Sequence, residues 1–421
     1  MAQTIVEKII SRHSGKSVQP DDLVVVPVDG TMASDTTAPL AITSFRAMGG
    51  KMLKNPDTCT LVIDHAAPAP NERIANLHQI MRDFAHEQGC RIYEAGQGIC
   101  HQLLLENNHI APGQLFIGAD SHTCSAGSIG TLGAGVGATD LAAVWLTGKI
   151  WLRVPASIRI NIENQLPRGV QSKDLILAVL GKTGIAGATY KSLEISGDAV
   201  AGFSTASRIV MANMMVEAGA KTGFIHPDGL APSLLSSAVY PDPDAVYETS
   251  ITLDAAGLSP MIARPHSPAD TCPVTMEAGR PIQYAFIGTC SNGRLEDLHL
   301  AASILKDSQV HPTTRLVIGP ASRSIFLDAV KDGTIEILTA AGATIIPPGC
   351  GPCVGTHNGV PGNGETVIST GNRNFKGRMG NPFAEIFLAS PATVAVSARK
   401  GKIADPTPYI SDYDKKKAKQ I

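Results

Sequence analysis

The sequence contains no long apolar run and no excess of one charge sign, and both absences limit its function. No segment approaches the roughly 20 apolar residues that a membrane-spanning helix requires, and the N-terminus lacks the apolar core of a signal peptide. The 35 basic and 37 acidic residues leave a formal net charge of −2, so no global field attracts nucleic acid or anionic lipid. We therefore expect a cytoplasmic protein without a membrane or nucleic-acid partner.

Cysteine is too sparse for a protein that is held together by disulfides. Eight cysteines are spread over 421 residues, which argues against a disulfide framework and favours metal or thiol chemistry for some of them. Cys59, Cys90, Cys124 and Cys272 have no close cysteine neighbour, and we interpret them as small hydrophobic residues of the core.

Short β-branched runs alternate with stretches of helical period. The predicted strands occupy residues 23–28, 60–64, 91–93, 115–118, 158–162 and 315–318, and the predicted helices occupy residues 71–88 and 102–107. This alternation is typical of α/β layers with a largely parallel sheet, so we predict an α/β fold in which these strands are buried. Proline-bearing joints then divide the chain into three predicted domains, residues 1–153, 154–280 and 281–421.

One segment of the first predicted domain is echoed in the third. Leu115–Ser121 (LFIGADS) resembles Ala285–Ser291 (AFIGTCS), each reading as a strand, a glycine and then polar residues. If the two segments correspond, both domains share a topology. Both would then present their chemistry beyond the carboxyl ends of strands, where open α/β sheets bind ligands.

The segment Pro347–Gly355 (PPGCGPCVG) places two thiols two residues apart in a Gly/Pro-rich loop. Cys350 and Cys353 match the Cys-Gly-Pro-Cys of a redox dithiol, although that motif normally opens a long helix in a small domain. A zinc site would need four ligands, for which Cys290 and His357 are available. A third interpretation joins Cys290 to the pair as three thiolates. A 4Fe–4S cluster held by only three cysteines keeps one iron open as a Lewis acid.

Ordered matches along nearly the whole chain resemble the large subunits of the aconitase superfamily, in particular the isopropylmalate dehydratase and homoaconitase branch. The most specific stretches are Ile63–His65, Gly96–Gln102, Gly118–Thr123, Asn213–Glu217, Gly288–Asn292, Gly349–Cys353 and Ser369–Arg378. The resemblance implies three α/β/α domains of the aconitase type around a central cluster, with the swivelling fourth domain absent. It also implies that Cys290, Cys350 and Cys353 hold a 4Fe–4S cluster with one open iron.

The resemblance further implies that carboxylates orient the catalytic histidines. The matching pairs are Asp64 with His65, Asp120 with His101, and Glu217 with His122. Hydroxide leaves carbon poorly unless it is protonated, and an imidazole bound to a carboxylate is a proton donor suited to neutral pH. His65 is the predicted donor. We predict structural or surface roles for the other histidines considered, which are His13, His78, His86, His226, His299 and His311.

Five further residues match the substrate-binding positions of the family. Arg373 and Arg378 correspond to its carboxylate binders, and Asn372, Asn213 and Ser121 correspond to other residues of the same pocket. A guanidinium pairs with a carboxylate through two parallel hydrogen bonds, so two arginines suit a dicarboxylic acid.

Two departures from true aconitases narrow the expected function. Pro39 stands where those enzymes carry a substrate-binding glutamine, which argues against citrate, and the chain ends soon after the third predicted domain. We therefore expect a small subunit that supplies the swivelling domain and a serine base. The implied activity is a hydro-lyase of small hydroxy-carboxylic acids, first 3-isopropylmalate dehydratase, with homoaconitase or 2,3-dimethylmalate dehydratase as alternatives. A thiol–disulfide oxidoreductase using Cys350 and Cys353 is the alternative of another class.

Overall fold

The computed structural model describes residues 2–410, which form a mixed α/β structure of two compact units. Within the described residues, unit 1 comprises residues 2–95, Cys100–Glu163 and Gly187–Leu253, and unit 2 comprises Gly96–Ile99, Asn164–Ala186 and residues 254–410. The predicted α/β class is confirmed. The predicted three-domain division does not follow these bounds and stays a prediction.

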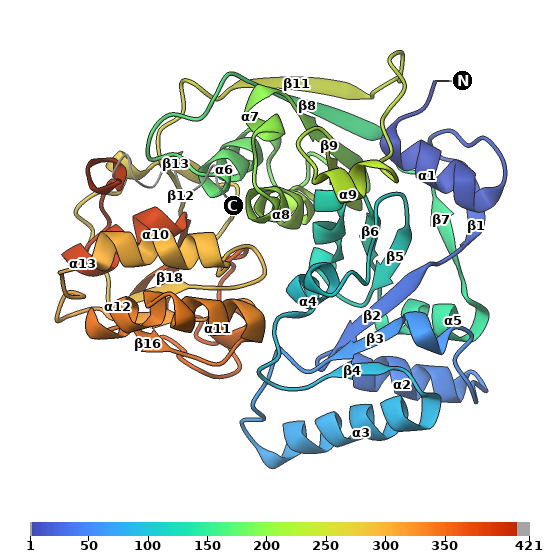
Figure 1. The fold of residues 1–421 in the computed structure, drawn as a ribbon, viewed down its shortest axis with the longest axis horizontal. Helices are drawn as coiled ribbons and strands as arrows, with labels where there is room; N and C mark the ends of the chain where they lie inside the picture. Colours follow the sequence, from blue (N-terminus) through green and yellow to red (C-terminus); the bar gives the residue numbers. More distant parts are fainter. Residues whose placement is uncertain (1, 411–421) are drawn as a thin grey trace. The chain divides into compact units, whose positions relative to one another are not determined.

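Unit 1 is built on a five-stranded parallel sheet in the order β4-β3-β2-β5-β6. In Figure 1, helices α2 and α3 lie beside this sheet, and α5 packs against α2. The elements of this part are α1 (Ile5–Ser14), β1 (Leu23–Pro27), β2 (Gly30–Ser34), α2 (Ala38–Ala47), η1 (Pro56–Thr58), β3 (Cys59–Val62), α3 (Glu72–Gln88), β4 (Arg91–Tyr93), α4 (Cys100–Glu106), β5 (Leu115–Gly118), η2 (Ser121–Ile129), β6 (Leu132–Gly135), α5 (Ala138–Thr147) and β7 (Lys149–Arg153).

A second sheet in unit 1 has the order β10-β9-β8-β11. Strand β9 is parallel to both β8 and β10. This sheet and its helices comprise β8 (Ser157–Glu163), β9 (Ser192–Ser196), α7 (Asp198–Ala201), α8 (Thr205–Met214), η3 (Met215–Ala218), β10 (Thr222–Ile225), α9 (Pro232–Leu235) and β11 (Thr249–Asp254). Helix α8 packs on η2, which joins the two parts of the unit.

Two of the strands predicted to be buried, β1 and β4, are partly exposed. Strand β4 lies at the edge of its sheet, and none of its three residues is fully buried. Among the strands of residues 2–410, β1 pairs only with β7, antiparallel, and its side chains alternate between exposed and buried. Leu23 and Val25 are 69% and 66% exposed, and Trp151, opposite Val25, is 64% exposed. The run of valines predicts a buried strand, but a two-stranded ribbon buries one face only, so that prediction is wrong for β1.

Unit 2 contains a seven-stranded sheet in the order β13-β12-β18-β17-β14-β15-β16. Its core packs between this sheet and helices α10 to α13, which are drawn in orange and red in Figure 1. The elements are α6 (Ser172–Thr183), β12 (Met261–Ala263), β13 (Thr271–Pro273), η4 (Val274–Met276), β14 (Tyr284–Ile287), α10 (Leu295–Leu305), β15 (Arg315–Ile318), α11 (Arg323–Lys331), α12 (Thr334–Ala340), β16 (Thr344–Ile345), η5 (Gly351–Val354), β17 (Thr366–Ser369), β18 (Glu385–Ala389), α13 (Pro391–Lys400) and η6 (Thr407–Tyr409).

The two units share one strand order. In each, five parallel strands in chain order a to e lie side by side as c-b-a-d-e, from β2 to β6 in unit 1 and from β14 to β18 in unit 2. The shared topology agrees with the expectation from the echoed segment. The echo itself matched non-equivalent strands, because β5 is the fourth strand of its set and β14 is the first. In both sets the order reverses beside strand a, and ligands bind at such switch points.

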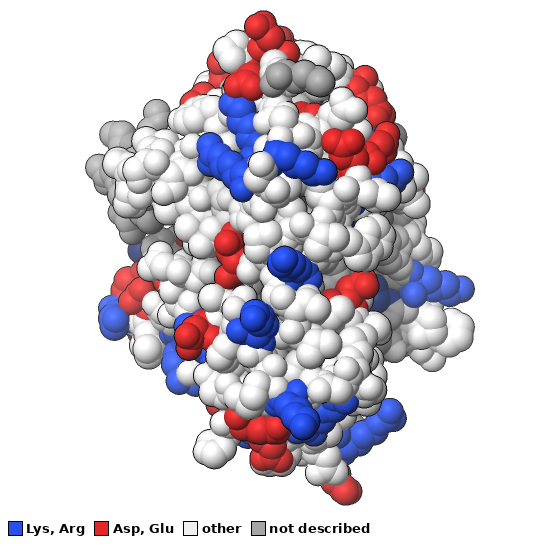
Figure 2. All heavy atoms as spheres, turned by 90° about the vertical axis from the view of Figure 1, so that its right-hand side faces the viewer, with Lys and Arg blue, Asp and Glu red and all other residues white. Residues whose placement is uncertain are grey.

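The surface carries mixed charge on the face that Figure 2 shows. Basic and acidic side chains are interspersed there, and neither sign covers a continuous area. This pattern agrees with the formal net charge of −2. No helix within residues 2–410 is long and apolar enough to cross a membrane.

Candidate active site

The predicted proton donor of unit 1 lies just beyond the carboxyl end of β3. Asp64 Oδ1 is 2.7 Å from Nδ1 of His65, and Asp64 Oδ2 accepts a 2.7 Å hydrogen bond from the amide of Cys100, at the start of α4. Both residues are buried. Because Nδ1 faces Asp64, the other ring nitrogen, Nε2, is directed elsewhere.

Three histidines converge on one carboxylate. Asp120 Oδ1 is 2.8 Å from Nε2 of His101 and 3.6 Å from Nδ1 of His122, and Asp120 Oδ2 is 3.5 Å from Nε2 of His65. Nε2 of His122 is 2.9 Å from Glu217. Burial alone would raise the pKa of Asp120, but the charge of His101 and the hydrogen bonds from the imidazoles hold it well below its usual range. Asp120 is therefore an anion between imidazoles.

A second carboxylate, not predicted from the sequence, supports this cluster. Asp35 follows β2 directly and accepts hydrogen bonds from the amides of Asp64, His65 and Ala66 at 3.2, 2.8 and 2.8 Å. Its Oδ2 is also 3.2 Å from Nε2 of His78, which is buried. Burial opposes ionisation of Asp35, yet the hydrogen bond from His78, the charge of His65 and the amide bonds lower its pKa to about 2. The only available sequence signal was an aspartate at a strand end.

Two predicted substrate-binding residues of unit 1 differ in exposure. Ser121 is exposed at the start of η2. Asn213 is fully buried, and its amide donates a 2.8 Å hydrogen bond to Ser125 Oγ, which in turn donates to the carbonyl of His122. These contacts hold His122 in place. The substrate-binding roles of both residues stay predictions.

In unit 2 the predicted cysteines and Asn372 follow three strands of the parallel set. Cys290 follows β14, Cys350 and Cys353 follow β16, and Asn372 follows β17. The Asn372 amide lies 3.2 Å from Cys290 Sγ, and its Oδ1 lies 3.8 Å from Cys353 Sγ. Cys353 donates its amide proton to the carbonyl of Cys350 at 3.2 Å within a single turn. All three cysteines are buried, and no cysteine of the described residues is in a disulfide.

Buried cations fix the loops that carry these groups. The ammonium of Lys173 has no exposed surface and donates to Ser291 Oγ and to the carbonyls of Thr370 and Gly371 at 3.2, 2.9 and 2.7 Å. Arg294 donates to the carbonyls of Ser291 and Cys290 at 2.8 and 2.7 Å. Neither cation was predicted, because a lone lysine or arginine carries no motif.

The two predicted arginines of unit 2 are partly exposed. Arg378 Nη2 lies 3.7 Å from Cys353 Sγ, whereas its Nε is buried and has no hydrogen-bond partner among the described residues. A buried N–H without a partner is costly, so this guanidinium is suited to an acceptor that is not part of the protein.

Known proteins resemble the chain along most of its length. The model of the aconitase family (aconitate hydratase) matches residues 7–281 and 275–401. The 3-isopropylmalate dehydratase large subunit 1 of Methanopyrus kandleri is 44% identical, covering 97% of this chain and 100% of that protein. The corresponding protein of Thermotoga maritima is 45% identical with the same coverage, and a probable methanogen homoaconitase large subunit of Methanosarcina mazei is 47% identical over 91% of this chain and 99% of its own length.

The chain belongs to the aconitase family.

This aconitase-family chain is accordingly an enzyme of the hydro-lyase class, and the family implies an iron–sulfur cluster. The residues of unit 2 fit such a group. Three buried thiols lie in loops fixed by internal hydrogen bonds, two of them on one amide, and sulfur ligands suit iron–sulfur clusters better than hard cations. A thioredoxin-type dithiol fits less well, because η5 is a four-residue turn and not the start of a long helix.

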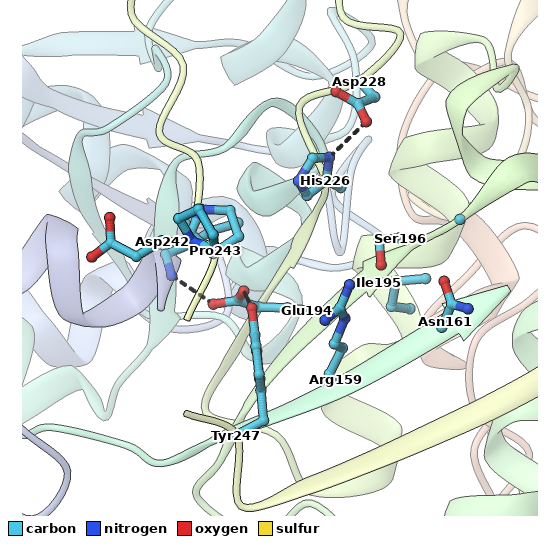
Figure 3. Close-up of a pocket in the computed structure, with 13 residues that line it drawn as sticks. Arg159, Asn161, Glu194, Ile195, Ser196, His226, Asp228, Asp242, Pro243 and Tyr247 are labelled. Carbon is cyan, nitrogen blue, oxygen red and sulfur yellow. Dashed lines mark hydrogen bonds and ion pairs between the residues drawn. The ribbon is translucent and has the colours of Figure 1, made fainter. Parts of the chain in front are cut away.

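A cavity of about 390 Å³ in unit 1 contains none of the predicted site residues. Figure 3 shows His226 paired with Asp228. Glu194 accepts a 2.8 Å hydrogen bond from the amide of Ile5. Glu194 also accepts from the hydroxyl of Tyr247 at 2.7 Å. Glu194, on β9, therefore links α1 and the loop before β11 to the second sheet of unit 1. These contacts give the residues around this cavity a structural role.

Proposed function

We propose that this chain is the large subunit of a 3-isopropylmalate dehydratase, a hydro-lyase that acts with a small subunit. The observation that carries the proposal is the gathering of three buried imidazoles on Asp120 in unit 1. Relatives named as large subunits of this enzyme are covered by the chain over their whole length, which supports the choice of substrate and partner.

The side chains of unit 1 supply the proton transfers. Asp64 accepts from Nδ1 of His65 and stabilises the imidazolium, so Nε2 carries the proton to the departing hydroxyl group. Asp120, facing Nε2 at 3.5 Å, stabilises the same cation before transfer. His101 and His122, each held by a carboxylate at 2.8 and 2.9 Å, keep Asp120 ionised and oriented.

The side chains of unit 2 supply binding. Cys290, Cys350 and Cys353 would hold a 4Fe–4S cluster, which when bound supplies Lewis-acid chemistry at its open iron. Arg378, with its buried unpartnered Nε, and Arg373 bind the carboxylates of the substrate. A serine of the small subunit acts as the base that removes the proton from the neighbouring carbon of the substrate.

Homoaconitase is the second candidate, because the Methanosarcina mazei relative with that name is 47% identical. Pro39 favours neither substrate. It lies buried in the first turn of α2, where a proline fits the helix backbone and offers no hydrogen-bonding side chain.

One experiment tests the proposal. The chain, purified and reconstituted with iron and sulfide without oxygen, is combined with the small subunit of a 3-isopropylmalate dehydratase and offered 3-isopropylmalate, homocitrate, 2,3-dimethylmalate and citrate. We expect dehydration of 3-isopropylmalate with the highest kcat/KM, and little turnover without the small subunit. A higher kcat/KM for homocitrate would make the chain a homoaconitase large subunit. Full activity of the isolated chain would contradict the assignment of the base to a serine of the small subunit.

A further inference from the structure

Two cysteines outside the candidate active site lie side by side in the core of unit 1. Cys59 is the first residue of β3, and Cys90 directly precedes β4. The two strands are parallel with Thr60 opposite Arg91, so the register continued by one residue places Cys59 opposite Cys90. Neighbouring strands lie about 4.8 Å apart, and a disulfide spans Cα atoms about 4.4–6.8 Å apart. The backbone therefore already has the separation that a disulfide requires.

The two thiols also contact each other. The thiol of Cys59 is hydrogen-bonded to the sulfur of Cys90, and this bond lowers the pKa of Cys90 and raises the pKa of Cys59. Burial raises the pKa of Cys59 further, and the nearby Arg91 guanidinium helps to lower that of Cys90. Cys59 is 1% exposed and Cys90 is 9% exposed, so a small oxidant reaches Cys90 first. Cys90 also has a fixed backbone, because its amide donates a 3.1 Å hydrogen bond to Ala85 at the end of α3.

Cys59 and Cys90 differ in these contacts from Cys124 and Cys272, the other two cysteines without a close cysteine neighbour in the sequence. Cys124 and Cys272 are buried on different elements, η2 and β13, with no cysteine opposite them in a strand register. A low-pKa thiol beside a second thiol is the arrangement in which oxidation stops at a disulfide.

We propose that Cys59 and Cys90 are a redox modification site that closes to a reversible disulfide on reaction with a two-electron oxidant such as hydrogen peroxide. The Cys90 thiolate attacks one peroxide oxygen, which breaks the O–O bond and yields a sulfenic acid and hydroxide. The sulfur of Cys59 then attacks the Cys90 sulfur, the S–S bond forms, and the sulfenic oxygen leaves as water with the proton of Cys59. In sum, two thiols and one hydrogen peroxide give one disulfide and two waters, and a reducing dithiol restores both thiols.

The disulfide joins the amino end of β3 to the segment between α3 and β4. Asp64 and His65 lie beyond the opposite end of β3. Because the crosslink closes a loop that contains the whole of α3, it restricts the unfolded chain and raises the thermal unfolding midpoint. It does so without entering the histidine cluster.

The test is peptide mapping of the complete, anaerobically purified protein. It is treated in its folded state with hydrogen peroxide, alkylated, and digested with trypsin without reduction. Cleavage after Lys54, Arg73, Arg82 and Arg91 leaves Cys59 in peptide 55–73 and Cys90 in peptide 83–91. We expect a linked pair of these peptides, two hydrogens lighter than their sum, that disappears after dithiothreitol. The unfolding midpoint should rise with the linkage and return with reduction.

Three variants sharpen the test. Cys90→Ser and Cys59→Ser should each abolish both the linked peptide and the rise in unfolding midpoint, whereas Cys272→Ser should keep both. Alkylated, unlinked Cys59 and Cys90 after oxidation of the other thiols would overturn the proposal. So would conversion of Cys90 to a sulfinic acid while Cys59 stays alkylatable, or linkage of Cys90 to several different cysteines.

Discussion

The two units place different chemistry on the same strand order. In unit 1 the carboxyl ends of the strands carry Asp35, Asp64 and Asp120, and each carboxylate meets imidazoles. In unit 2 the corresponding ends carry thiols and an asparagine, and the charged groups behind them are cations bound to carbonyls. The topology therefore decides where side chains converge, and the residue types decide what they do there.

The difference is also electrostatic. Unit 1 places buried carboxylates against imidazoles, which are side chains that can take up and release a proton. Unit 2 has permanent cations at Lys173 and Arg294, and both donate to backbone atoms next to Cys290 or Asn372. A fixed positive charge near thiolates favours their ionised, ligand-binding form. Changes in unit 1 should thus alter proton transfer, and changes in unit 2 should alter cluster retention.

The largest expected effect is the loss of a proposed cluster ligand. Cys350→Ser replaces a soft thiolate by a hydroxyl, so the chain should lose most of its iron and its activity should fall by at least about a thousandfold. Iron and sulfide content, visible absorbance and kcat check this. Cys124→Ser, on η2 in unit 1, is the matched control and should retain iron. An active, iron-loaded Cys350→Ser protein would remove Cys350 from the ligand set.

The next largest effect is expected for the proton donor. His65→Ala should lower kcat by about a hundredfold to ten-thousandfold with a smaller change in KM, and the protein should keep its iron. The alkaline limb of the rate profile for dehydration should flatten, because the acid is gone. His86→Ala, an exposed position on α3, should match the parent. Loss of iron from His65→Ala would contradict the assignment of proton transfer to unit 1 and of cluster retention to unit 2.

The sequence predicted the fold class and strands β3, β4, β5, β8 and β15 of the parallel sheets, because β-branched runs and local periodicity encode them. It did not predict other strands of these sheets, such as β2, β9 and β17. It also pointed to the cysteines and the paired histidines, which stand in distinctive local motifs. Asp35 and Lys173 were missed because their partners are distant in the chain. Asp35 binds atoms 29 to 43 residues away, and Lys173 binds atoms 118 to 198 residues away. The exposed face of β1 was missed because burial depends on which strand pairs with it.

A smaller effect, on stability, is expected from the buried cation of unit 2. Lys173→Met keeps a chain of similar length but removes three hydrogen bonds to a charged donor. The Thr370 carbonyl still accepts from Ser291 Oγ, whereas the Gly371 carbonyl loses its donor. An unsatisfied buried group costs about 1–3 kcal/mol and the lost bonds to a charge add to this, so a loss of about 2–4 kcal/mol is expected. Iron retention should fall with it. Lys182→Met, near the end of the same helix, is the control. Thermal unfolding and iron content measure both effects, and a stable, iron-replete Lys173→Met protein would contradict them.

The smallest effect is pH-dependent and belongs to Asp35. Its pKa is about 2 in the folded protein and 3.8 in the unfolded chain, so the folded state binds fewer protons between these values. A depressed pKa of this kind contributes stability that is fully present above about pH 4 and is lost as the pH falls toward 2. The shift corresponds to roughly 2–3 kcal/mol. Asp35→Asn should therefore be less stable than the parent at pH 7 by about this amount, and the gap should narrow steadily below pH 4. Urea unfolding of both proteins across this range measures the gap, with the exposed Asp57→Asn as control. A difference in unfolding free energy that stays constant down to pH 2 would show that the contribution of Asp35 does not depend on its charge. Its hydrogen bonds to the amides around His65 would then stabilise the fold equally with a neutral side chain.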